Sequence, residues 1–312
     1  MEFGDRIGYN RRNDLDEIRK RKRKNRMSKV LVIGKNSYIA KNLLHLTKEW
    51  NVKNQYDAVS ASSGEWETYS FETYDTVIML AAIVHKKETD ENRKLYQEVN
   101  VDLTFKIARK AKMEGVKQFI FMSTIAVYGN KITEITDNTV LYPVTEYAKT
   151  KKTAEELLMR LEERGFRIAI VRPPMVYGKN APGNFAKLEK LIRSVHVFPK
   201  TYNKRSVIYI ENLCKFLDLL VENMNSGIFH PQDDEYLCTS EIAEALRKKN
   251  GRKSIIIIPI KPVILLGCKC SKYVNKIFGS LYCSQTLSMH EEMDYIIVPH
   301  KNAIEKSVGT NL

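Results

Sequence analysis

Short apolar runs alternate with longer segments of helical periodicity along most of this chain. Runs rich in β-branched and aromatic residues are typical of strands buried on both faces of a parallel sheet. We expect such strands at residues 29–33, 56–61, 75–82, 118–123 and 166–171, and two further short strands at 227–230 and 254–258. Amphipathic stretches predict helices at residues 34–50, 91–112, 146–163, 211–223 and 240–249. This alternation predicts an α/β fold in which a doubly wound parallel sheet is joined by a smaller carboxyl-terminal lobe.

Composition predicts an ordinary globular protein with a basic extension. The chain has 312 residues, of which 43% are hydrophobic, and a formal net charge of +14. Residues 1–29 hold 11 Lys and Arg against 5 Asp and Glu. We expect residues 1–27 to be a solvated, disordered or frayed extension that precedes the first strand. Nucleic-acid binding is not expected, although such a basic run could support it.

The cysteines and the apolar runs exclude several other classes of protein. Five cysteines with no paired ligand spacing indicate neither a disulfide framework nor a metal site. The longest apolar run, Ile255 to Cys268, is interrupted by two prolines and a lysine, and it is shorter than the ~18 residues of a membrane span. We therefore expect a cytoplasmic protein. A peripheral membrane contact by residues 261–278 is a second possibility.

Candidate chemistry gathers at the end of the fourth expected strand. The run Phe119–Met122 leads into Ser123 and Thr124, and open α/β sheets build their sites at the carboxyl ends of strands. Tyr147 and Lys151 follow in a helical segment, four residues apart, so both side chains fall on one face. An ammonium beside a phenol favours the phenolate, and we expect Lys151 to lower the pKa of Tyr147.

A second candidate site lies at the first strand. The segment Gly34–Ala40 follows the strand directly and opens a helix, as in sites where backbone amides face a pyrophosphate. The second strand ends in Val59–Ser63 without the acid that binds the ribose hydroxyls of NAD. The turn after the first strand leads us to expect NAD as cofactor, and the missing acid means that NADP is not excluded.

These features resemble the extended branch of the short-chain dehydrogenase/reductases, the NAD-dependent epimerase/dehydratase family that includes UDP-glucose 4-epimerases. The resemblance covers roughly residues 28 to 260 and implies a Rossmann-type fold. It includes Arg172-Pro-Pro-Met-Val-Tyr-Gly178, similar to the family's Arg-Pro-x-Asn-Val-Tyr-Gly turn, and a late Arg205. It implies a cofactor domain at residues 28–180, rejoined by parts of 200–235, and a substrate lobe at 181–312.

The resemblance also implies roles for particular residues. Thr124, Tyr147 and Lys151 would be catalytic. The implied cofactor-binding residues are Gly34, Asn36, Ser37, Tyr38, Ile39, Ala81, Ala82, Asn100, Tyr147, Lys151 and Pro174. The implied substrate-binding residues are Ser123, Thr124, Tyr147, Asn184 and Arg205, of which Arg205 would hold a phosphate. No metal is implied. In this superfamily the helices equivalent to 91–112 and 146–163 commonly pair in a homodimer.

The implied reaction is hydride chemistry at a sugar carbon of a UDP-sugar. We expect epimerisation at C4 of a UDP-hexose or UDP-N-acetylhexosamine through a transient 4-keto intermediate. Reduction of a UDP-4-keto-6-deoxy-sugar by NADH or NADPH is the main alternative, favoured by Met175 in place of the usual asparagine. A non-catalytic nucleotide sensor is a third reading. Dehydration is disfavoured because Ile125 and Ala126 stand where dehydratases carry an acid pair.

Overall fold

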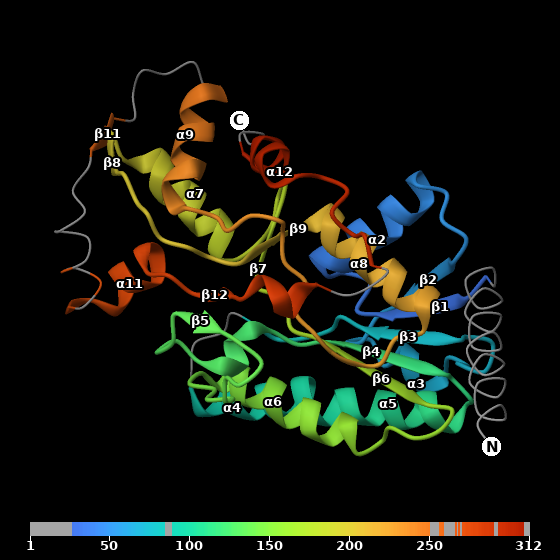
Figure 1. The fold of residues 1–312 in the computed structure, drawn as a ribbon. Helices are drawn as coiled ribbons and strands as arrows, with labels where there is room; N and C mark the ends of the chain where they lie inside the picture. Colours follow the sequence, from blue (N-terminus) through green and yellow to red (C-terminus); the bar gives the residue numbers. More distant parts are fainter. Residues whose placement is uncertain are drawn as a thin grey trace, which may run out of the picture.

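A six-stranded parallel sheet forms the centre of the molecule, as the computed structural model shows (Figure 1). The structure describes residues 27–84, 89–249, 256–258, 266, 268, 270–289 and 293–308. Residues 1–26 of the expected basic extension, and residues 261–265 of the stretch considered for membrane contact, lie outside the described residues. The sheet order is β10-β6-β4-β3-β1-β2. Its strands are β1 (Lys29–Ile33), β2 (Gln55–Val59), β3 (Thr76–Met79), β4 (Gln118–Met122), β6 (Arg167–Val171) and β10 (Gly227–Phe229).

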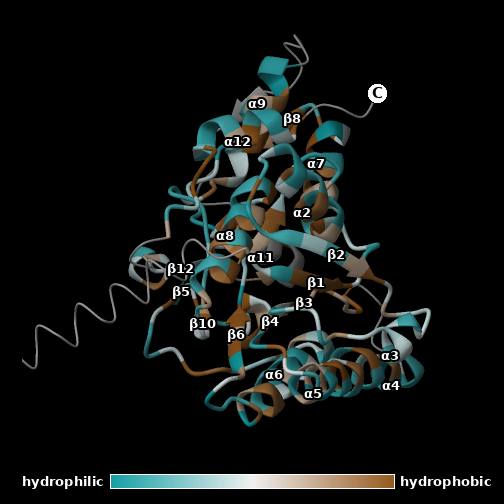
Figure 2. Ribbon diagram, turned by 90° about the vertical axis from the view of Figure 1, so that its right-hand side faces the viewer, coloured by the Kyte–Doolittle hydropathy of each residue, from teal (hydrophilic) through white to brown (hydrophobic). Residues whose placement is uncertain are grey.

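Strand side chains divide between two cores because successive residues of a strand point to opposite faces. In β1, Val30 and Val32 belong to one buried cluster, and Leu31 and Ile33 belong to the other. Helices α2 (Tyr38–Glu49) and α8 (Ile210–Asn223) contribute to the first cluster, and α5 (Thr104–Met113) and α6 (Glu146–Met159) contribute to the second. The hydrophobic strands therefore lie between two helical layers (Figure 2). This arrangement confirms the expected doubly wound α/β fold.

The helix expected at residues 91–112 contains an irregular turn. It consists of α4 (Asp90–Gln97), a π-helical turn η1 (Glu98–Leu103) and α5. π-helical turns are rare and occur often at functional sites. In this turn Asn100 is fully buried and faces the loop that follows β3. A short helix, α3 (Glu65–Thr68), follows β2.

The carboxyl-terminal lobe is smaller and contains short paired strands. Its helices are α7 (Asn184–Ser194), α9 (Thr239–Lys249), α11 (Lys272–Phe278) and α12 (His300–Ser307), with a 3-10 turn η3 (Gln285–Ser288). Parallel pairs join β7 (Met175–Tyr177) to β9 (Val207–Tyr209), β8 (Val197–Pro199) to β11 (Ile256–Ile258), and β5 (Glu134–Ile135) to β12 (Tyr282–Cys283). The last pair links the lobe to the loop between β4 and α6. Among the described residues, no helix has the length and apolar character that a membrane span requires.

Candidate active site

Hydrogen bonds made by the predicted catalytic residues connect helix α6 to the end of β4. Thr145 caps α6 by accepting a hydrogen bond of 3.2 Å from the Ala148 amide, so the helix begins just before Tyr147. The Tyr147 hydroxyl hydrogen-bonds the side chain of Thr124. One turn further, the Lys151 ammonium donates a hydrogen bond of 2.8 Å to the Met122 carbonyl oxygen. The fold thus brings together the three residues that the sequence predicted to be catalytic.

Thr124 is held in place by the local backbone. It caps the short 3-10 turn η2 (Ile125–Tyr128), and its Oγ1 accepts a hydrogen bond of 3.1 Å from the Ala126 amide. The Ile125 amide in turn donates to the Pro173 carbonyl oxygen over 3.1 Å. The Thr124 side chain therefore has a fixed position next to the Tyr147 hydroxyl.

The expected lowering of the Tyr147 pKa by Lys151 was wrong, because the pKa of Tyr147 is raised in the structure. Burial raises the pKa of Tyr147, the hydrogen bond with Thr124 opposes that increase only in part, and Tyr96 raises the pKa further. Burial also lowers the pKa of Lys151 to about 7, although the nearby Glu155 carboxylate acts in the opposite direction. Desolvation disfavours the charged form of each group. Tyr147 is therefore protonated at neutral pH in this structure.

The turn after β1 is shaped for close approach of another group. Gly34 has φ +106°, and a side chain there would place its Cβ 2.8 Å from the Ala81 amide nitrogen. Ser37 caps α2 by accepting a hydrogen bond of 3.1 Å from the Ala40 amide. The amides of Tyr38 and Ile39 belong to the first helical turn and have no partner within the helix. Such amides, with the glycine cradle beside them, fit the diphosphate of a dinucleotide.

The remaining predicted cofactor residues lie around this turn. The Tyr38 hydroxyl donates a hydrogen bond of 3.0 Å to the Lys179 carbonyl oxygen, which follows the Pro-Pro turn. Asn36 is exposed, Ala82 is half-buried in the loop after β3, and Pro174 is buried between β6 and β7. A contact between each of these residues and the cofactor stays a prediction.

Asn100 forms hydrogen bonds with the loop after β3. Its Oδ1 accepts from the Ile83 amide over 2.9 Å, and its Nδ2 donates to the Ile83 carbonyl oxygen over 3.0 Å. Nδ2 also lies 3.2 Å from Thr150 Oγ1 on helix α6. Asn100 therefore fixes the segment that contains Ala81 and Ala82 against the helix of Tyr147.

Sequence analysis missed a carboxylate near the end of β2. Glu65, the first residue of α3, lies with its Oε2 3.4 Å from Lys35 Nζ and 3.5 Å from the Ser60 amide nitrogen. The strand itself ends without an acid, but the chain folds back and supplies one from six residues further on. Only the Gly64-Glu65 turn after the serine run could have indicated this in the sequence.

The predicted substrate residues of the lobe occupy separate elements. Asn184 is exposed at the first position of α7. Arg205 precedes β9, donates a hydrogen bond of 3.0 Å from Nη1 to the Gly279 carbonyl oxygen, and pairs its backbone with Leu237 and Leu281. Burial lowers the pKa of its guanidinium. Ser123, the other predicted substrate residue, is buried and donates a short hydrogen bond to Glu155.

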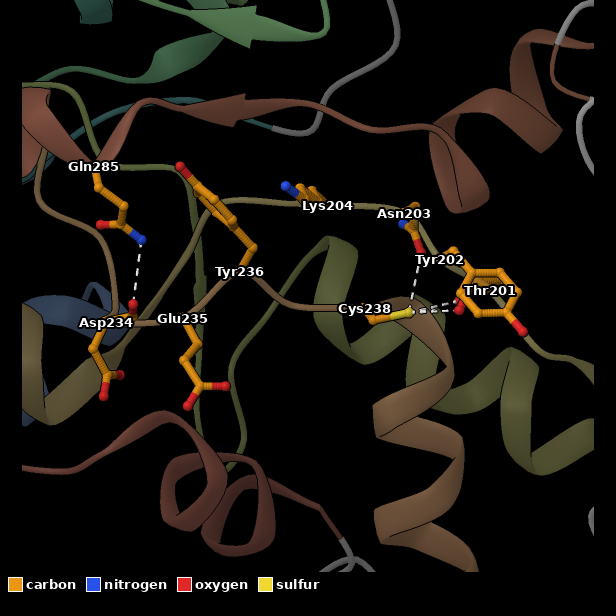
Figure 3. Close-up of a pocket in the computed structure, with 9 residues that line it drawn as sticks. All are labelled: Thr201, Tyr202, Asn203, Lys204, Asp234, Glu235, Tyr236, Cys238 and Gln285. Carbon is orange, nitrogen blue, oxygen red and sulfur yellow. Dashed lines mark hydrogen bonds between the residues drawn. The ribbon is translucent and has the colours of Figure 1, made fainter.

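A pocket of about 490 Å³ lies in the lobe beside the Arg205 segment (Figure 3). Lys204, Tyr236 and Cys238 are among its lining residues, and none of the predicted catalytic residues is. The Lys204 ammonium lies 5.8 Å from the centre of the Tyr236 ring. The pocket is therefore separate from the Thr124, Tyr147 and Lys151 set.

Comparison with known proteins shows the family of this chain. The family model described as the NAD dependent epimerase/dehydratase family matches residues 30–230, which contain Gly34, Thr124, Tyr147 and Lys151. The chain belongs to this family. As a family member it is an NAD-dependent enzyme, and among the described residues no cluster of potential ligands could hold a metal ion.

Two curated relatives match about four fifths of the chain. It is 27% identical over 274 residues to an N-acetyl-α-D-glucosaminyl-diphospho-ditrans,octacis-undecaprenol 4-epimerase of Escherichia coli O157:H7, covering 81% of this chain and 82% of that protein. It is 28% identical to a UDP-glucose 4-epimerase of Vibrio cholerae, covering 80% and 82%. The structure of a UDP-glucuronic acid 4-epimerase from Bacillus cereus with NAD has a TM-score of 0.66 at 17% identity, covering 89% of this chain and 94% of that one. The last comparison concerns the fold alone.

Proposed function

We propose that this family member interconverts the C4 epimers of a UDP-hexose or UDP-N-acetylhexosamine through a transient 4-keto sugar. The observation that carries the proposal is the contact of Tyr147 with Thr124, one helical turn from Lys151. Tyr147 can donate and accept a proton, and the Thr124 hydroxyl beside it is fixed. This pair is suited to a sugar alcohol that is oxidised to a ketone and then reduced again. The two curated relatives described above are named as 4-epimerases, which supports the same reaction.

The protein residues have distinct tasks in this proposal. In its phenolate form, Tyr147 would take the proton of the C4 hydroxyl during oxidation, and it would return that proton to the carbonyl oxygen during reduction. Thr124 hydrogen-bonds the same sugar oxygen and so orients it toward the Tyr147 hydroxyl. NAD, when bound, supplies the acceptor and donor of the C4 hydride. Lys151 would hold the nicotinamide ribose, and with NAD bound its ammonium would favour the phenolate form of Tyr147.

We assign cofactor binding to residues 28–180 and sugar-nucleotide binding mainly to residues 181–312. Gly34, Ser37, Tyr38 and Ile39 would hold the diphosphate of NAD, with Asn36, Ala81, Ala82, Asn100 and Pro174 around its remaining parts. Glu65 would hydrogen-bond the adenosine ribose, the task of the acid that usually ends the second strand. Arg205 would bind a phosphate of UDP and Asn184 the sugar or diphosphate.

We further propose that the enzyme works in the cytoplasm as a homodimer through α4, α5 and α6. Met113 at the end of α5 is 80% exposed, and Met159 at the end of α6 is 38% exposed. Large apolar side chains with such exposure on adjacent helices are consistent with a covered surface in a dimer. Light scattering after gel filtration tests this, and a monomer at micromolar concentration would contradict it.

The test of the proposed reaction begins with the purified protein. Denaturation should release stoichiometric NAD, identified by chromatography and absorbance, since a cofactor recycled in place has no need to leave. UDP-glucose and UDP-N-acetylglucosamine should then give their C4 epimers without added reductant. Protein that releases no nucleotide, and that reduces a UDP-4-keto-6-deoxy-sugar with NADPH, would establish the reductase alternative instead.

A further inference from the structure

Glu155 is a buried carboxylate that the proposed reaction does not use. It follows Lys151 by one helical turn on α6, so both side chains lie on the same face. Lys151 is 1% exposed and Glu155 is 3% exposed. A buried carboxylate without partners would be costly, so its contacts must explain how it is tolerated.

Arg172 and Ser123 hold this carboxylate from two other elements. Arg172 follows β6 and binds Glu155 in a two-pronged contact, Nη2 to Oε2 over 2.6 Å and Nε to Oε1 over 3.1 Å. The hydroxyl of Ser123, at the end of β4, donates a short hydrogen bond to Oε1. Because a guanidinium and a carboxylate match in shape, this pairing fixes the carboxylate in position as well as balancing its charge.

The contacts of α6 form a regular series along the end of β4. Tyr147, Lys151 and Glu155 occur at every fourth position and contact Thr124, Met122 and Ser123 respectively. Three consecutive residues, the last of β4 and the two that follow it, are therefore contacted from three consecutive turns of the helix. A change at Glu155 would act on Lys151 and Thr124 through this shared segment.

Other titratable groups approach the cluster from neighbouring elements. The Tyr128 hydroxyl of η2 accepts a hydrogen bond of 2.7 Å from Arg172 Nη1 and lies 2.8 Å from His230 Nε2, which follows β10. Cys283 of β12 is buried, and the Arg172 charge lowers the pKa of its thiol although burial raises it overall. Tyr147 lies on the helix itself. Glu155 is the carboxylate among the groups named here, and Arg172 is the cation in contact with it.

We propose that Glu155 is a positioning residue, clamped by Arg172 and Ser123 so that its carboxylate keeps the Lys151 ammonium charged and in place. The inference rests on the proposed function, because the reaction gives Lys151 its task. Burial works against a charged lysine, and an opposite charge one turn away counteracts burial. The two-pronged contact with Arg172 prevents the carboxylate from turning away.

The test variant removes the charge of Glu155 and keeps the shape of its side chain. Glu155→Gln should move the alkaline limb of the pH profile of kcat toward lower pH by about one unit, since Lys151 loses the charge that favours its protonated form. Activity should then fall about tenfold at pH 8 and by less than about threefold at pH 6. Glu155→Asp should restore part of the activity at pH 8. The substrates are UDP-glucose and UDP-N-acetylglucosamine, with NAD bound.

A second measurement does not depend on turnover. Competitive acetylation with acetic anhydride, read by peptide mass spectrometry, follows the titration of Lys151, with the exposed Lys149 as an internal standard. Its titration should move to lower pH in Glu155→Gln. If neither sugar nucleotide is converted by the wild type, the proposed reaction fails while this titration still decides the role of Glu155. The double variant Glu155→Gln/Arg172→Gln should shift Lys151 in the same direction without leaving an unpaired guanidinium.

The matched control is Asp218→Asn, which neutralises another buried carboxylate. Asp218 accepts hydrogen bonds from Asn54 and Tyr56 between α8 and the edge strand β2. It should reduce stability and leave both the pH profile and the Lys151 titration unchanged. A loss of activity in Glu155→Gln by one factor at every pH, with an unshifted Lys151 titration, would show that Glu155 is only structural and would overturn the proposal.

Discussion

The Lys151 ammonium donates a hydrogen bond of 2.8 Å to the Met122 carbonyl oxygen and lies 4.4 Å from the centre of the Phe121 ring. Both partners belong to β4, so the lysine side chain is directed into the protein. Burial lowers its pKa to about 7, with Glu155 opposing the change. Such a site is costly for stability, which is common where a charged group is required for chemistry.

Replacement of Lys151 should therefore separate activity from stability. The folded protein disfavours the charged lysine between pH 7 and the ordinary lysine pKa, so the unfolded chain binds more protons and stability rises with pH in that window. Lys151→Met should lower turnover at least about a hundredfold and raise Tm at pH 7 by about 3 °C or more. Calorimetry and a turnover assay check this. Lys149→Met, on the exposed side of the helix, should change neither, and a lower Tm for Lys151→Met would argue against the assignment.

Tyr147→Phe should remove the proton transfer and leave binding intact. The hydroxyl hydrogen-bonds Thr124, and phenylalanine retains the ring, so the ring can keep its place in the variant. Loss of a general acid and base typically costs about 10² to 10⁴ in rate. Turnover should fall in that range, while NAD and UDP affinities measured by calorimetry stay within about twofold.

The control for that variant is Tyr142→Phe, because Tyr142 is 63% exposed in the loop before α6. It should behave as the wild type. Undiminished turnover in Tyr147→Phe with normal nucleotide binding would favour the sensor alternative over any enzyme that uses this residue.

Glu65 should set the preference for NAD over NADP. A carboxylate at the end of β2 hydrogen-bonds ribose hydroxyls and repels a 2′-phosphate. Glu65→Gln should weaken NAD binding about tenfold and narrow the difference between NAD and NADP, partly because Lys35 then loses its 3.4 Å partner. Titration calorimetry with both dinucleotides measures the ratio. Glu67→Gln on the same short helix is the control, and an unchanged ratio in Glu65→Gln would remove Glu65 from the cofactor site.

The sequence was sufficient to predict the sheet because its apolar runs are long and bounded by turns. Gly34, Thr124, Tyr147 and Lys151 could be placed for the same reason: each directly follows a strand or shares a helical face. Residues whose roles depend on tertiary contacts could not be predicted. Glu155 is paired with Arg172, which follows β6 and lies 17 residues further along the chain. No local pattern in the sequence indicates that partner.

The interruption of the long helix was missed for a similar reason. Asn100 lies inside an amphipathic pattern that favours a regular α-helix, but its hydrogen bonds with Ile83 and Thr150 accompany a π-helical turn. The predicted lowering of the Tyr147 pKa was wrong because helical spacing indicates only that Tyr147 and Lys151 are close. It does not indicate how deeply the two side chains are buried. Desolvation is a property of the assembled core.

His300 should make stability depend on pH. Its ring nitrogens lie at ion-pair distances of 3.6 Å from Asp233 and 3.5 Å from Glu241, in a side chain that is 1% exposed. Burial alone would lower its pKa, but the two carboxylates raise it to about 9. The stabilisation is therefore fully present below the unfolded pKa of about 6.5 and is lost as pH rises through about 9.

Chemical denaturation between pH 6 and pH 10 measures this effect. The difference in free energy of unfolding between the wild type and His300→Gln should fall by about 2 kcal/mol over the range, because the opposite contribution of Lys151 is present in both proteins and cancels. His45→Gln alters a histidine with a 76% exposed side chain and should follow the wild type. Identical slopes for the wild type and His300→Gln would mean that the histidine is neutral throughout.

Retention of the hydrogen at C4 tests the proposed reaction most directly. The protein as purified is incubated with UDP-N-acetylglucosamine deuterated at C4, with no added reductant, and the products are separated and examined by mass spectrometry and NMR. The account predicts the C4 epimer with the deuterium still at C4, because the same hydride leaves and returns within one site. No epimer, or an epimer that has lost its deuterium to solvent or to a pool of added dinucleotide, would contradict the account.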